Sequence, residues 1–70
     1  MEVICKKDGL RYFTVGKSYI AKWVINTDDP YEPEFELETK DDEYDNHVIA
    51  YSDDKDTSDD EWFNEYFDVV

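Results

Sequence analysis

Short runs of alternating apolar and polar residues recur along the chain, a pattern typical of β-strands. In residues 18–26, every second side chain from Tyr19 onward is apolar and falls on one face. In residues 34–38, Phe35 and Leu37 point one way and three glutamates point the other. Both runs predict strands that turn one face toward a core.

Clusters of β-branched residues predict further strands at both ends of the chain and between the acidic segments. Residues 12–15 could add one more short strand. The turn residues Asp8-Gly9, a proline-containing segment at 27–33 and charged loops at 41–45 and 52–58 separate the runs. The additional strands are expected at residues 1–6, 46–51 and 66–70.

A helix start is indicated at Ser58, because Glu61 follows it at the spacing of a capping box. The aromatic residues after it are spaced to share one helical face. Two arrangements fit: a helix over about 59–67, or one helical turn that leads into a last strand at 66–70. The second is favoured because the chain ends in a β-rich stretch.

Together these elements predict a mainly β fold, a small curved antiparallel sheet or barrel of five to six strands with one short helical turn near the C-terminus. A length of 70 residues predicts one domain, residues 1–70. An aromatic content of 17% argues against disorder. A domain this small buries little surface, so homodimerisation would add stabilising contacts.

A single cysteine, Cys5, excludes an internal disulfide and favours a reducing, cytosolic compartment. The sequence contains neither the pattern of a signal peptide nor an apolar run long enough to span a membrane. We therefore expect neither, and anionic membrane surfaces would repel the chain.

Charge is distributed very unevenly along the sequence. Residues 1–27 carry five Lys or Arg against two acids, a net charge of +3. Residues 28–70 carry eighteen acids against two lysines, a net charge of −16, which gives −13 for the whole chain. So dense an anionic field destabilises the compact state by self-repulsion. One reason to keep it is a strongly basic partner, such as a protein surface that binds nucleic acid.

The glutamates of residues 34–38 form the sharpest constellation. Side chains two apart on a strand are separated by roughly 6.6–6.8 Å, a spacing similar to that of successive phosphates along one DNA strand, whose axial rise is about 3.4 Å per nucleotide. This ladder, extended by the acidic loops, predicts a partner-binding surface, whereas the simpler alternative is a solvated acidic face. The predicted contacts are Glu34, Glu36, Glu38, Asp41, Asp42, Glu43, Asp45, Asp53, Asp54 and Asp56.

Other chemistry is weakly indicated. Cys5 and His47 could form a nucleophilic pair, but a buried strand cysteine and a histidine at a strand start are plainer interpretations. An EF-hand loop beginning at Asp54 would end with Glu65 as its bidentate ligand, yet it places Asp59 where glycine is needed. We expect no enzyme activity, no catalytic residues, no metal and no cofactor; an acidic calcium-binding domain remains a third alternative.

The aromatic residues suggest a second function. Direct binding to nucleic acid is not expected, because the chain would repel phosphates. Exposed aromatic side chains could instead anchor a mainly apolar contact with a host enzyme such as RNA polymerase or a replication protein. The candidate anchors are Trp23, Trp62, Phe63 and Tyr66.

Three stretches resemble those of small phage and bacterial proteins with an SH3-like barrel. Val3–Lys6 and then Phe13–Tyr19 resemble their opening, in which a strand is followed by a T-x-G-K-x-Y turn into the next strand. Tyr66–Val70 resembles their closing strand. The resemblance implies the fold and carries no functional residue.

Small size and extreme acidity are similar to those of phage host-takeover proteins that mimic DNA, most of all phage inhibitors of the histone-like nucleoid protein HU. This resemblance implies a non-enzymatic inhibitor in the cytoplasm of a host cell that occupies the DNA-binding surface of HU or a similar basic protein. It is an analogy of size and charge.

Overall fold

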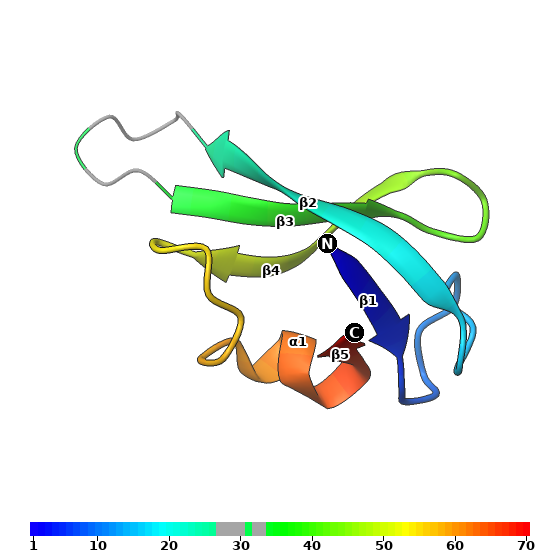
Figure 1. Cartoon of the computed structure of the whole chain (residues 1–70). Helices are drawn as coiled ribbons and strands as arrows, with labels where there is room; N and C mark the ends of the chain where they lie inside the picture. The colour runs from blue at the N-terminus through cyan, green and yellow to red at the C-terminus, as the bar shows by residue number, and fades with distance from the viewer. Residues whose placement is uncertain (27–30, 32–33) are drawn as a thin grey trace.

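The structure is a computed structural model that describes residues 1–26, 31 and 34–70. Five antiparallel strands form a curled, half-barrel sheet with one short helix at its open side (Figure 1). The elements are β1 (Glu2–Cys5), β2 (Ser18–Asn26), β3 (Glu34–Lys40), β4 (Asn46–Ser52), α1 (Glu61–Tyr66) and β5 (Phe67–Val69).

The strands lie in the order β4-β3-β2-β1-β5, so β4 and β5 are the two edges. A register shift between Leu37 and Glu38 interrupts the β3–β4 ladder. Such a bulge bends the strand and increases its twist. Helix α1 contacts both edge strands, and thereby covers the open side of the curled sheet (Figure 1).

The core lies between the concave face of the sheet and α1. From the sheet it takes alternate residues, with Val3 and Leu37 at 0% exposure. From the end of the chain it takes Phe63 and Phe67, whose rings stack with centroids 5.8 Å apart. Phe13 packs edge-on against Phe67 at 5.3 Å. Aromatic rings from two segments far apart in the sequence therefore help to fill the core of this small fold.

The predicted fold class is confirmed, and the strand predicted at 18–26 has those bounds. The strand predicted at residues 12–15 is wrong. Turns at residues 11–12 and 15–16 flank Phe13 and Thr14, and Phe13 lies in the core. The end of β1 is paired instead with the residues just before β2. The amide of Gly16 donates to the carbonyl of Cys5 at 2.7 Å, and the amide of Cys5 donates to the carbonyl of Lys17 at 3.1 Å.

The short helix followed by a last strand is also confirmed. Its cap differs from the prediction, because Asp60 and not Ser58 occupies the N-cap position. Ser58 is engaged in the preceding loop, where its hydroxyl donates to Asp56 at 2.8 Å. The Asp60 carboxylate instead accepts the amide hydrogen of Phe63 at 2.8 Å.

The turn predicted at 27–33 lies, apart from Tyr31, outside the described residues. In the described part of the chain, no helix is long and apolar enough to cross a membrane.

Candidate acidic interface

The glutamate ladder lies on the convex face of the sheet, as predicted. Glu34 is exposed, whereas Glu36 and Glu38 are half-buried between the neighbouring strands. Asn26 on β2 donates to Glu36 at 3.1 Å, which fixes the middle carboxylate. From Glu34 to Glu38 the three carboxylates of the ladder span about 13 Å along β3.

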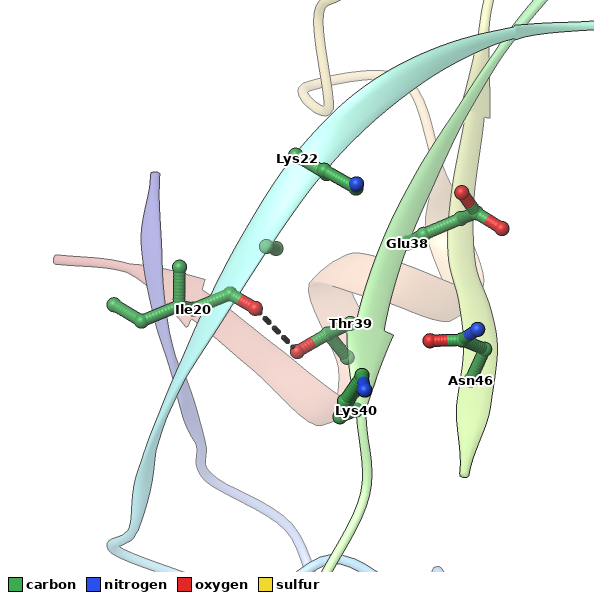
Figure 2. A pocket seen from close by; sticks show the side chains of 7 residues that line it. Ile20, Lys22, Glu38, Thr39, Lys40 and Asn46 are labelled. Atoms are coloured by element: carbon green, nitrogen blue, oxygen red, sulfur yellow. Dashed lines mark hydrogen bonds between the residues drawn. The ribbon is translucent and has the colours of Figure 1, made fainter. Parts of the chain in front are cut away.

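The Glu38 end of the ladder is less anionic than the Glu34 end. A shallow hollow of about 470 Å³ opens there on the convex face, and Lys22, Lys40 and Asn46 line it together with Glu38. Figure 2 shows these side chains on the neighbouring strands β2, β3 and β4. Two ammonium groups beside one carboxylate offset its charge, so the uncompensated part of the ladder is Glu34 and Glu36.

Asp41, in the turn between β3 and β4, serves the fold and is only 3% exposed. It accepts hydrogen bonds from the amides of Glu43 and Asp45, at 2.8 and 3.0 Å, and its other oxygen lies 2.6 Å from His47 Nε2. Burial alone would raise the pKa of Asp41, but these hydrogen bonds lower it below its usual value. Buried in this way, Asp41 does not present its carboxylate to a partner.

Asp42 fastens the same turn to the segment that precedes β2. Its carboxylate accepts hydrogen bonds from Lys17 and Tyr19, each at 2.7 Å, and from Thr14 at 2.8 Å. Together these bonds lower the pKa of Asp42 to about 2. Its charge is largely satisfied within the molecule, which leaves Glu43 and Asp45 as the exposed acids at the hairpin tip.

A second exposed acidic segment follows β4, at the opposite end of the β3–β4 hairpin from the 41–45 turn (Figure 1). Asp53, Asp54 and Asp56 are all exposed. Ser52 donates to Asp54 at 2.7 Å, and the amide of Ser58 donates to Asp56 at 2.9 Å. The loop is therefore ordered by its own side chains while its carboxylates still face water.

Three of the four lysines of the basic first part are joined to acids outside the ladder. Lys6 pairs with Asp68 at 3.0 Å, Lys7 pairs with Glu65, and Lys17 pairs with Asp42 at 2.7 Å. Among the described residues, no ion pair involves the ladder, the exposed acids of the hairpin tip or the loop after β4. These pairs leave the exposed acids of the hairpin without a neutralising partner in the described part of the chain.

The alternative chemistries find little geometric support. The Cys5 thiol is buried, and burial raises its pKa, which lowers the thiolate fraction at neutral pH. His47 faces Asp41. Across the described ranges, no three His, Cys, Asp or Glu side chains gather as a ligand set for a metal ion.

Two further exposed acids follow the loop after β4 in the chain. Asp59 and Glu61 flank the cap residue of α1 and are exposed. The sequence shows them as part of an acidic cluster, but their position beside the loop after β4 depends on where the helix begins.

Comparison with known proteins finds no matching family model, no matching curated protein and no matching solved structure.

Proposed function

We propose that this protein is a DNA mimic of the phage type, which acts in the cytoplasm of a host bacterium. It binds the DNA-binding surface of a basic host protein, with the nucleoid protein HU as the best candidate, and competes with DNA for that surface. Carboxylates take the place of phosphates, and no chemical step is involved.

The observation that carries this proposal is the distribution of unpaired carboxylates. They follow the β3–β4 hairpin from Glu43 and Asp45 at its tip, through Glu36 and Glu34, to the loop that contains Asp53. Three other acids, Asp42, Glu65 and Asp68, are paired with lysines within the molecule. A strand holds its carboxylates at fixed spacing, so little conformational freedom is lost when a row of Lys and Arg side chains binds them.

Electrostatics also favour this mode of binding. A net charge of −13 on 70 residues attracts a cationic partner over long range and accelerates encounter. Counterions released when such a surface meets its partner make the affinity fall as salt rises.

The direct test is displacement of a fluorescent DNA duplex from purified HU, followed by anisotropy. We expect the protein to release the duplex, and the triple variant E34K/E36K/E38K to lose this ability while its circular dichroism spectrum is unchanged. Displacement at unchanged affinity by the triple variant would remove the ladder from the binding surface.

A matched pair of variants separates position from total charge. E34Q/E36Q removes two ladder carboxylates, whereas E2Q/D8N removes two from β1 and the loop after it, and both variants carry the same net charge. The first is expected to weaken displacement about ten-fold and the second less than about two-fold. Equal losses would mean that overall charge, and not this hairpin, governs binding.

A further inference from the structure

Trp62 forms a wall of two adjoining hollows at the edge of the sheet. The first, of about 250 Å³, lies between β4 and α1 and is lined by Val48, Ile49, Tyr51, Asp60 and Trp62, and we call it the Trp62 slot. The second, of about 230 Å³, lies against the segment from Leu10 to Phe13. Trp62 is 43% exposed and Tyr51 is 53% exposed, so two large aromatic side chains border the slot and remain accessible.

The walls of the slot are held in place before any partner arrives. Both oxygens of Asp60 are engaged, one by the amide of Phe63 at 2.8 Å and the other by the amide of Tyr51 at 2.9 Å. These two bonds connect the start of α1 directly to the edge strand. The Trp62 ring packs on Tyr66 with centroids 5.1 Å apart. A hollow whose walls are fixed in this way binds without the entropic cost of ordering them.

Exposed charge near the Trp62 slot restricts the kind of partner that the slot can bind. Asp59 and Glu61, the chain neighbours of Asp60, are exposed, and so is Asp53, two residues beyond Tyr51. In the described part of the chain, none of these three joins an ion pair. The second hollow differs, because Arg11 and His47 line it. An apolar slot whose lining residues have exposed acids next to them in the chain is complementary to an apolar side chain that is flanked by Lys or Arg.

From this we infer that the Trp62 slot receives the apolar wedge of a basic, DNA-bending protein. Proteins that bend DNA through the minor groove insert such wedges between base steps while cationic residues hold the backbone. An aromatic, apolar slot near exposed carboxylates resembles an opened base step near phosphates, because each offers an apolar contact and negative charge. This inference rests on the proposed function and deepens it, because it gives the competition a second, uncharged contact.

The test uses two cyclic peptide probes that differ at one position. Each probe carries a turn in which a central residue has one arginine on each side. The central residue is isoleucine in one probe and serine in the other. Binding is followed by anisotropy of a label on the peptide. We expect the wild-type protein to bind the isoleucine probe about ten-fold more tightly than the serine probe.

Three variants decide where this preference originates. W62A and Y51S are each expected to reduce the preference to less than about two-fold, and the second variant serves if the first is poorly folded. I20T removes an exposed apolar side chain from β2, outside the slot, and is expected to keep the preference.

Equal binding of both probes by the wild-type protein would overturn the slot and leave the acidic surface intact. The same conclusion would follow if the preference survived in both W62A and Y51S. Failure of both probes to bind at low salt would count against the proposed function itself, and against the slot with it.

Discussion

At the scale of single residues, neighbouring carboxylates in one turn have opposite roles. Asp41 and Asp42 are enclosed by hydrogen-bond donors that fix the turn to the body of the protein. Glu43 and Asp45, in the same turn, are exposed. The first pair stabilises the fold and the second adds to the external field. Removal of an acid from this turn therefore affects either stability or binding, depending on the position.

The lowered pKa of Asp42 predicts a specific acid sensitivity. Its pKa is about 2 in the folded protein and 3.8 as the ordinary value. A depressed pKa contributes stability that is fully present above the ordinary value and is lost as the pH falls through the folded value. The urea midpoint of D42N should therefore lie below that of the wild type at pH 6, and the gap should close as the pH approaches 2.

Urea unfolding of both proteins between pH 6 and pH 2 measures this gap directly. The difference between the two proteins isolates Asp42, since the general loss of negative charge in acid affects both alike. A gap that stays constant down to pH 2 would contradict the role assigned to the Lys17, Tyr19 and Thr14 hydrogen bonds.

The sequence predicted which segments are acidic, but it did not show which acids are exposed and which stabilise the fold. The alternation of residues 34–38 correctly placed the glutamates on the face opposite to Leu37. No comparable signal distinguishes Asp41 from Asp45, because the burial of Asp41 depends on His47 and on backbone amides that only the folded turn brings together. The exposure of a side chain in a turn can therefore be assigned only from the tertiary structure, whereas the face on which a strand residue lies follows from the two-residue period.

At the scale of elements, Asp60 connects the helix to the sheet. One carboxylate oxygen caps α1, and the other accepts the amide of Tyr51 on the edge strand β4. An edge strand with unpaired amides is a site for unwanted pairing with another chain. Asp60 thus occupies one such amide while it fixes the start of the helix.

Loss of this connection should be costly for so small a fold. We expect D60A to lower the free energy of unfolding by about 1–2 kcal/mol, since it removes an N-cap and a second hydrogen bond at once. The matched variant D59A removes an exposed acid one residue earlier and should change stability by less than about 0.5 kcal/mol. Chemical denaturation of both variants checks the prediction, and equal effects would show that the cap contributes nothing beyond charge.

The strands and the helix-then-strand ending followed from patterns that local chemistry dictates. The β2 alternation and the β-rich end of the chain are examples. The incorrect strand at 12–15 has a tertiary cause: Phe13 is drawn into the core between Tyr19 and Phe67, and the amide of Thr14 is satisfied by the Tyr19 hydroxyl at 2.8 Å. Apolar content in a short segment does not reveal whether it forms a strand or a turn that delivers one ring to the core.

At the scale of the whole molecule, one electrostatic field has two opposed consequences. Repulsion among the carboxylates weakens the folded state, and the same carboxylates attract a cationic partner. Added salt screens both effects. Stability and affinity should therefore change in opposite directions with ionic strength.

The effect of salt on stability can be tested on the protein without a partner. Between about 0.02 and 0.5 M NaCl, a range over which screening becomes strong, we expect the urea midpoint to rise, because relief of repulsion in a chain of net charge −13 exceeds the weakening of its few ion pairs. A midpoint that falls with salt would mean that the internal pairs of Lys6, Lys7 and Lys17 dominate, and that the field is weaker than its formal charge.

The central claim, occupation of a DNA-binding surface, is tested most directly by capture from a bacterial lysate with the protein immobilised, followed by elution with either salt or duplex DNA. We expect that a basic DNA-binding protein such as HU is retained at low salt, elutes as salt rises, and is displaced by the duplex. A captured partner that resists both salt and DNA would contradict the proposed function, because its contact could not then be a set of carboxylates in place of phosphates.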